Sequence, residues 1–103
     1  MLGARTPIEH YDVDLWQKVI QTNLSAPFAL TRYLLPLLRL SEDASVLFTT
    51  SSVGNYGRAY WGAYCVSKFG IEGLAQMLAD ELGDTRIRVN CINPGGIRTE
   101  MRQ

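Results

Sequence analysis

Hydrophobic positions along the chain predict two helices and two strands, in the order helix, strand, helix, strand. Apolar residues recur at helical spacing from position 15 to about position 40, which predicts a first helix capped by Asp12 or Asp14. Pro27 lies inside this helix and predicts a kink or a local break, because proline removes one backbone hydrogen bond. A second helix is predicted over 61–82, with Gly83 as its C-terminal cap.

Two short apolar, β-branched runs, 45–50 and 87–92, are typical of buried strands. Residues 51–62 contain three glycines and predict a loop beyond the first strand, and a sharp turn follows the second strand at 93–96. A strand, a crossover helix and another strand of these lengths predict a parallel βαβ unit. We therefore expect an α/β fold, part of a doubly wound parallel sheet, with no domain boundary inside residues 1–103.

Composition and charge exclude several functional classes. Ten basic and ten acidic residues give a formal net charge of zero without long runs of either sign, so we expect neither nucleic-acid nor membrane binding. The most apolar stretch, 34–40, is short and is interrupted by Pro36 and Arg39, so no membrane-spanning helix is predicted. Cys65 and Cys91 lack metal-ligand spacing and fit reduced thiols, so we expect a cytoplasmic protein without a metal site.

Tyr64 and Lys68 are the first candidates for chemistry. Residues four apart lie on the same face of a helix, and a nearby ammonium favours the phenolate form of a tyrosine. Such a phenol can exchange a proton with an alcohol or carbonyl oxygen. The spacing alone is weak evidence, because it also arises by chance on solvated helix faces. Ligands of such sheets bind beyond the carboxyl ends of the strands, where Ser51 and residues 93–99 also fall.

Four short motifs occur in a fixed order along the chain. They are Thr22-Asn23-Leu24, Thr50-Ser51-Ser52-Val53-Gly54, Tyr64-Cys65-Val66-Ser67-Lys68 and Asn93-Pro94-Gly95-Gly96-Ile97-Arg98-Thr99. Ser51 lies thirteen residues before Tyr64, and Asn23 lies twenty-eight residues before Ser51. Over nearly its whole length the chain thus resembles the central portion of a short-chain dehydrogenase/reductase, with a Rossmann-like fold. Segments 5–9 and 90–96 look most like the YciK-type bacterial oxidoreductases.

The resemblance implies an oxidoreductase that transfers hydride between a nicotinamide cofactor, NAD or NADP, and a small carbonyl or alcohol substrate. It makes Tyr64 the acid/base and Lys68 the residue that binds the nicotinamide ribose and favours the phenolate. It makes Ser51 the donor to the substrate carbonyl, with Ser52 as the alternative. Asn23 matches an asparagine that holds a proton-relaying water in a kinked helix, although it could also simply bond nearby backbone.

The resemblance also implies cofactor-binding residues and an oligomer. The cofactor-binding residues are Tyr64, Lys68, Pro94, Gly95, Ile97 and Thr99. The last four form a turn against the nicotinamide, although Pro94-Gly95 would end a strand whatever the function. A homodimer or homotetramer through the two long helices is implied, with candidate burial at Leu34, Leu35, Leu38, Phe69, Leu74, Met77 and Leu78. Tyr56, Tyr60 and Trp61 either line a substrate cleft or pack.

The chain departs from the family pattern in lacking a glycine-rich loop that could hold a pyrophosphate. We therefore expect residues 1–103 to be a partial NAD(P)-binding Rossmann-like domain, without its N-terminal glycine-rich half and its C-terminal substrate elements. Two interpretations stay open. The chain is a catalytic oxidoreductase segment that needs the missing half, or a truncated, non-catalytic oligomerisation module derived from this family. In isolation it should bind dinucleotide poorly.

Overall fold

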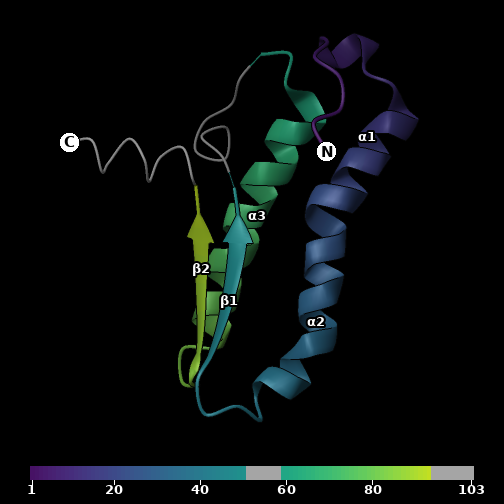
Figure 1. Cartoon of the computed structure of the whole chain (residues 1–103). Helices are drawn as coiled ribbons and strands as arrows, with labels where there is room; N and C mark the ends of the chain where they lie inside the picture. Colours follow the sequence, from purple (N-terminus) through teal and green to yellow (C-terminus); the bar gives the residue numbers. More distant parts are fainter. Residues whose placement is uncertain (51–58, 94–103) are drawn as a thin grey trace, which may run out of the picture.

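The computed structural model describes residues 1–50 and 59–93, and its elements follow the predicted order (Figure 1). The helices and strands are the 3-10 turn η1 (Ile8–His10), α1 (Val13–Ile20), the π-helix η2 (Gln21–Ser25), α2 (Ala26–Leu38), β1 (Ala44–Thr49), α3 (Gly62–Glu81) and β2 (Ile87–Ile92). The predicted α/β class is confirmed.

The first long helix consists of α1, η2 and α2 in continuous succession. Asp12 is its N-cap, and its Oδ2 accepts a hydrogen bond of 2.8 Å from the backbone N–H of Leu15. The local break predicted at Pro27 is present as η2, the wider π-helical turn that comes just before this proline. In a regular α-helix the N–H of residue 27 would bond to the carbonyl of Asn23, and proline has no N–H to give.

The two strands form a parallel pair, in register from Ala44 opposite Ile87 to Thr49 opposite Ile92. The first strand begins and ends one residue earlier than predicted. The backbone N–H of Thr50 still donates to the carbonyl of Ile92 at 2.8 Å, so the ladder continues one step beyond β1. Because α3 connects two parallel neighbours, the predicted βαβ unit is confirmed.

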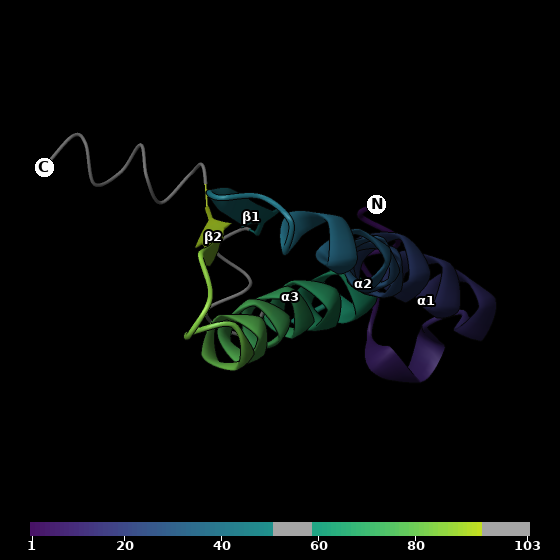
Figure 2. The same ribbon diagram turned by 90° about the horizontal axis from the view of Figure 1, so that it is seen from below.

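Helix α3 covers one face of the sheet, and α2 lies beside α3 (Figures 1 and 2). The core lies between α3 and the strands and consists of Ala44, Phe48, Ile71, Ala75, Leu78, Leu82 and Ile87. Side chains of β1 alternate, so Phe48 is buried in this core while Leu47 is 55% exposed on the opposite face.

The C-terminal end of α3 differs from the prediction. The helix ends at Glu81, and Gly83 does not adopt the left-handed backbone conformation that makes glycine a favoured cap. Thr85 closes the turn instead, because its N–H and its hydroxyl both donate to the carbonyl of Leu82, at 2.9 and 2.7 Å. The sequence therefore predicted the position of the helix end closely, but the glycine cap that it predicted is not formed.

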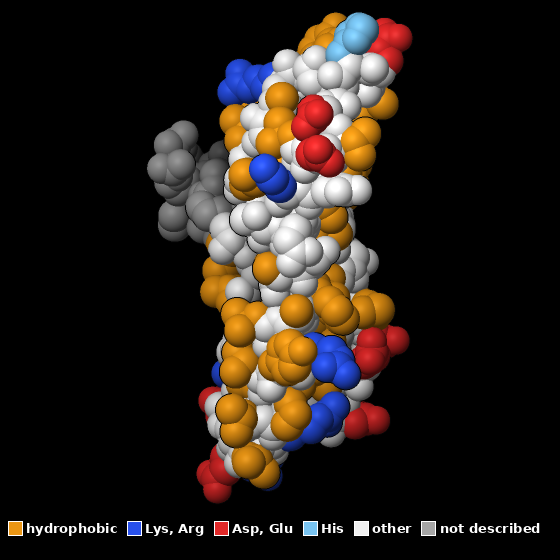
Figure 3. All heavy atoms as spheres, turned by 90° about the vertical axis from the view of Figure 1, so that its right-hand side faces the viewer, with side chains coloured by type: hydrophobic (Ala, Val, Ile, Leu, Met, Phe, Trp, Pro, Cys, Tyr) orange, Lys and Arg blue, Asp and Glu red, His pale blue; other side chains and the backbone are white. Residues whose placement is uncertain are grey.

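The outer face of α2 is apolar. Figure 3 shows hydrophobic side chains gathered over the half of the molecule where this helix lies. The large exposed side chains of α2 are Phe28, Leu30, Tyr33, Leu34 and Leu37. Despite this surface, none of the helices in residues 1–50 and 59–93 has the length and hydropathy to cross a bilayer.

Candidate active site

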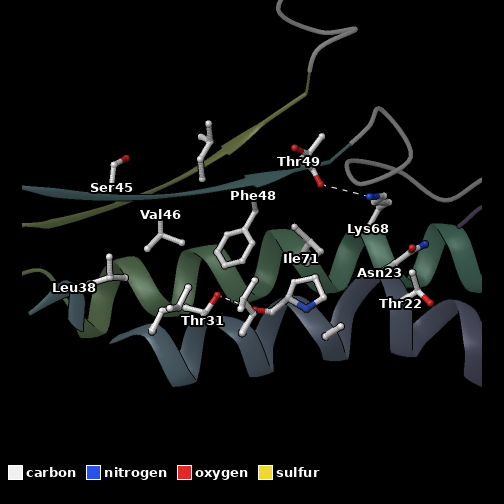
Figure 4. A pocket seen from close by; sticks show the side chains of 15 residues that line it. Thr22, Asn23, Thr31, Leu38, Ser45, Val46, Phe48, Thr49, Lys68 and Ile71 are labelled. Atoms are coloured by element: carbon white, nitrogen blue, oxygen red, sulfur yellow. Dashed lines mark hydrogen bonds between the residues drawn. The ribbon is translucent and has the colours of Figure 1, made fainter. Parts of the chain in front are cut away.

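Tyr64 and Lys68 lie in the first turns of α3, next to the carboxyl ends of the strands (Figure 1). Lys68 Nζ is 5.6 Å from the centroid of the Tyr64 ring, so the four-residue spacing brings the ammonium beside the phenol. The ammonium also donates a long hydrogen bond of 3.4 Å to the carbonyl of Thr49, at the end of β1 (Figure 4). This bond orients Lys68 along the sheet edge where ligands of parallel sheets bind.

Asn23 is buried in η2, and together with Lys68 it lines one end of a groove between α2 and β1 (Figure 4). Its Oδ1 accepts a hydrogen bond of 2.8 Å from the N-terminal ammonium of Met1, and its Nδ2 donates to the Met1 carbonyl at 2.7 Å. Nδ2 also donates to Ser67 Oγ at 3.2 Å. The carboxamide therefore bonds to Met1 and to the Ser67 hydroxyl, both far away in the sequence, rather than to backbone nearby in its own helix.

Ser67 is a site residue that the sequence reasoning missed. Its side chain is fully buried, and its hydroxyl donates a 2.7 Å hydrogen bond to the carbonyl of Tyr64 while accepting from Asn23. Through Ser67 the π-helical turn is tied to the first turn of α3. The sequence feature that could have predicted this role is the helical spacing of Ser67, one turn after Ala63 and one turn before Ile71. This spacing places its hydroxyl on the buried face of α3.

Gly70 permits a close approach of α3 to η2. A Cβ atom at this position would lie 2.6 Å from Leu24 Cδ2, a distance that packed atoms do not tolerate. The absence of a side chain at Gly70 thus lets Leu24, the neighbour of Asn23, pack directly on α3. Two adjacent contacts, one polar through Ser67 and one apolar through Gly70, hold Asn23 near Lys68.

An aromatic and a second cation precede Tyr64. The Trp61 ring lies 5.8 Å from the Tyr64 ring at an interplanar angle of 55°, and Arg5 Cζ lies 4.6 Å from the centroid of Trp61. Of the three aromatic residues that flank the predicted loop, Trp61 thus adjoins the site. Tyr60 is 59% exposed, and Tyr56 lies outside the described residues.

Several predicted site residues lie outside the part of the chain that the structure describes. They are Ser51, Ser52, Pro94, Gly95, Ile97 and Thr99. Their neighbours Thr50 and Asn93 are described and lie at the carboxyl ends of β1 and β2. The Thr50 side chain is buried, and its hydroxyl has no hydrogen-bond partner among the described residues.

Cys91 in β2 faces charged residues of α3. Burial raises the pKa of its thiol above the ordinary value, and the Glu72 carboxylate, through its charge and a hydrogen bond, raises it further, while Lys68 lowers it. The neutral thiol is therefore favoured, which is typical of a structural cysteine. Across residues 1–50 and 59–93, no cluster of histidine, cysteine and carboxylate side chains could hold a metal ion.

A groove of about 670 Å³ lies between α2 and β1 (Figure 4). Asn23, Thr49 and Lys68 form its polar end, and apolar side chains such as Leu34 and Phe48 line the rest. The site therefore brings together the Tyr64–Lys68 pair, the buried amide of Asn23 and an adjacent apolar groove at one edge of the sheet.

Comparison with known proteins agrees with this geometry. The family model for the short chain dehydrogenases matches residues 2–103. The chain is 55% identical over 102 residues to the uncharacterized oxidoreductase YciK of Escherichia coli. This alignment covers 99% of this chain and 40% of YciK. It is 34% identical over 100 residues to a 3alpha-hydroxysteroid dehydrogenase of Mediterraneibacter gnavus, covering 97% of this chain and 40% of that one.

Solved structures of short chain dehydrogenases also resemble this chain. A short chain dehydrogenase from Salmonella enterica serovar Typhi superposes with a TM-score of 0.87 at 53% identity, over 91% of this chain and 39% of that one. A Shigella flexneri structure complexed with NADP gives a TM-score of 0.85 at the same identity and coverage.

The chain belongs to the short chain dehydrogenase family, with a fold that is part of the family's Rossmann-like sheet. The likeness to the YciK oxidoreductase confirms the narrower resemblance found in the sequence. The chain spans about 40% of the length of the relatives named above.

Proposed function

We propose that this chain is the catalytic segment of an NAD(P)-dependent oxidoreductase that interconverts a carbonyl compound and the corresponding alcohol. The observation that carries the proposal is the position of Lys68 Nζ, 5.6 Å from the Tyr64 ring, at the carboxyl edge of the sheet. Relatives that are named as dehydrogenases of cyclohexanol and of a hydroxysteroid support this chemistry.

In the proposed reaction, Tyr64 passes a proton to the substrate oxygen during reduction, or takes one during oxidation. Lys68 would hold its ammonium beside the Tyr64 ring during this proton transfer. Ser51 would donate a hydrogen bond to the same substrate oxygen and stabilise the charge that develops there. The nicotinamide cofactor supplies or receives the hydride.

Asn23 would contribute through its backbone. Both hydrogens of its Nδ2 are used, one by the Met1 carbonyl and one by Ser67 Oγ. Its own carbonyl, by contrast, lacks the α-helical donor that residue 27 would supply, because that residue is Pro27. We therefore infer that a proton-relaying water between Asn23 and Lys68 would bind this carbonyl.

The residues present fit one end of the proposed cofactor. Tyr64 and Lys68 place a hydroxyl and an ammonium at the sheet edge, the groups that would bind the ribose hydroxyls next to the nicotinamide. Pro94, Gly95, Ile97 and Thr99 would contact the nicotinamide itself. The NADP complex of the Shigella flexneri relative supports NADP, and NAD is the alternative. Residues 1–103 contain no glycine-rich loop for the pyrophosphate, so we propose that they form a partial binding domain.

The test is Tyr64→Phe in the protein as expressed from its natural gene, assayed by NADPH consumption with a panel of aldehydes and ketones. Removal of a general acid/base should lower kcat/KM by about 10²–10⁴-fold. Tyr33→Phe is the matched control, because Tyr33 is 72% exposed on α2. Wild-type turnover that survives in Tyr64→Phe would disprove the assigned role. A 103-residue chain that reduces carbonyls as fast as complete relatives would disprove the partial-domain proposal.

An apolar helix surface favours a second candidate, a non-catalytic oligomerisation module. Leu35, Leu38 and Leu74 pack against the core of the chain and Leu78 is buried in it, so they are used internally. Leu34, Phe69 and Met77 are 41%, 42% and 51% exposed.

We propose that these three exposed side chains contribute to a homodimer or homotetramer of a cytoplasmic protein. Light scattering on Met77→Glu, with Leu40→Glu as the control, tests this, because Leu40 is 82% exposed outside the helix. A Met77→Glu protein with unchanged mass would contradict it.

A further inference from the structure

Four side chains follow one another along the start of α3. Arg5 Cζ lies 4.6 Å from the Trp61 ring, the Trp61 ring lies 5.8 Å from the Tyr64 ring, and the Tyr64 ring lies 5.6 Å from Lys68 Nζ. Residues 61, 64 and 68 have the spacing of a single helix face. Tyr64 therefore has one cation next to it and a second cation beyond Trp61.

The backbone on both sides of Arg5 is held in place. The N–H of Ala4 donates to the hydroxyl of Tyr11 at 3.3 Å, and the N–H of Thr6 donates to the carbonyl of Tyr60 at 3.0 Å. These bonds fix the N-terminal segment against the start of α3. The guanidinium is thus positioned over Trp61 by the fold itself and by the attraction of a cation to an indole face.

The guanidinium is available for a ligand. A planar guanidinium that stacks on a ring uses its face, while its N–H groups point outward from its edge and can bind a carboxylate with two hydrogen bonds. Arg5 is exposed, and the ion pairs found among the described residues, His10 with Glu9 and Arg88 with Asp43, do not involve it.

We propose that Arg5 binds a carboxylate of the substrate, so that the substrates are oxo acids or hydroxy acids rather than neutral carbonyl compounds. The reacting carbon would lie at Tyr64, the body of the substrate would lie against Trp61, and the carboxylate would pair with Arg5. This assignment rests on the proposed oxidoreductase function, and it adds the charge of the substrate and the residue that selects it.

The test compares 4-formylbenzoate with its neutral methyl ester as substrates of the natural protein with NADPH. Arg5→Gln should lower kcat/KM for 4-formylbenzoate at least about tenfold, mainly by raising KM, because it removes a charged hydrogen-bonded pair. The value for the ester should change less than twofold. Arg5→Lys keeps the charge but loses the two parallel N–H donors of the guanidinium. Its kcat/KM for 4-formylbenzoate should therefore lie between those of wild type and Arg5→Gln.

Arg32→Gln is the matched control, because Arg32 also stacks on an aromatic ring, that of Tyr33 at 5.7 Å, on α2. It should leave the preference for the acid over the ester unchanged. If Arg5→Gln affects the acid and the ester equally, or affects neither, Arg5 does not select a carboxylate and the proposal is wrong.

A binding measurement separates this proposal from the oxidoreductase function. We would follow the indole N–H resonance of Trp61, assigned with Trp16→Phe, during titration with 4-formylbenzoate. If neither compound is reduced but the acid shifts this resonance and Arg5→Gln weakens binding at least fivefold, the carboxylate site stands and the reductase proposal fails. If the acid leaves the resonance unchanged, or binds equally well to Arg5→Gln, the carboxylate site is overturned.

Discussion

Asn23 and Ser67 lie forty-four residues apart in the sequence and are joined by a buried hydrogen bond of 3.2 Å, from Nδ2 to Oγ. The Ser67 hydroxyl passes the connection on to the carbonyl of Tyr64 at 2.7 Å. A π-helical turn in the first long helix and the first turn of α3 are thereby fixed relative to each other. The position of the proposed acid/base thus depends on a serine that need not touch the substrate.

Ser67→Ala should destabilise the protein by about 1–3 kcal/mol, because it leaves a buried N–H of Asn23 without an acceptor. The free energy of unfolding in urea measures this loss. Ser41→Ala is the matched control, since the Ser41 hydroxyl bonds only to the exposed backbone of Asp43. We expect the control to change stability by less than about 0.5 kcal/mol. Equal losses of unfolding free energy in both variants would show that the buried hydrogen bond contributes no more to stability than the exposed one.

The sequence predicted the elements and the pairing of Tyr64 with Lys68, because both follow from short-range periodicity. It did not predict the Ser67 bridge or the stack of Arg5 on Trp61. Each joins segments that only the tertiary fold brings together, and serine and arginine are common residues on exposed surfaces. Gly83 shows the opposite error. Glycine after a helix often adopts the left-handed conformation, and the sequence predicted this cap, but Gly83 does not adopt that conformation. The roles of Ser51 and of residues 94–99 stay predictions.

Lys68→Met should remove the charge next to Tyr64 and the bond to the Thr49 carbonyl while it preserves most of the side-chain volume. We expect kcat/KM for carbonyl reduction to fall by about 10²-fold or more, in line with the loss of assistance to a general acid/base. Lys18→Met is the control, because Lys18 is exposed on α1 and is the other lysine of the chain. Steady-state kinetics with NADPH measure both. Comparable rates for Lys68→Met and wild type would contradict a catalytic role for the ammonium.

The reactivity of Cys91 should respond in opposite directions to its two charged neighbours. Glu72 raises the pKa of the thiol and Lys68 lowers it, and only the thiolate reacts with iodoacetamide. At a pH of about 8, which is below the ordinary cysteine pKa, Glu72→Gln should therefore speed alkylation of Cys91 and Lys68→Met should slow it. Mass spectrometry of the modified peptide measures the rate, with Cys91→Ser to identify the site. Unchanged rates in both variants would show that burial alone controls the thiol, and changes of the same sign would contradict the opposite effects of the two charges.

The same raised pKa has a consequence for stability. A group whose pKa is higher in the folded state than in the unfolded state stabilises the fold fully below the unfolded pKa. That contribution is lost as the pH rises above the ordinary thiol pKa of 9.0 and passes the higher folded pKa. We expect Cys91→Ser to reduce the alkaline loss of stability, as measured by thermal unfolding between about pH 8 and pH 10.

Two glycines of α3 should respond oppositely to alanine. At Gly73 a Cβ atom would meet nothing within 4 Å, so Gly73→Ala should stabilise the helix by about 0.5–1 kcal/mol through propensity alone. At Gly70 the Cβ atom would lie 2.6 Å from Leu24 Cδ2, so Leu24 must move, at a cost of about 1–3 kcal/mol that offsets the gain in propensity. Because Leu24 adjoins Asn23 in η2, Gly70→Ala should also lower kcat, whereas Gly73→Ala should leave kcat unchanged. Urea unfolding and NADPH turnover, measured on both variants, test the pair. If the two alanines stabilise the protein equally, the close contact between α3 and the π-helical turn does not hold Asn23 in position.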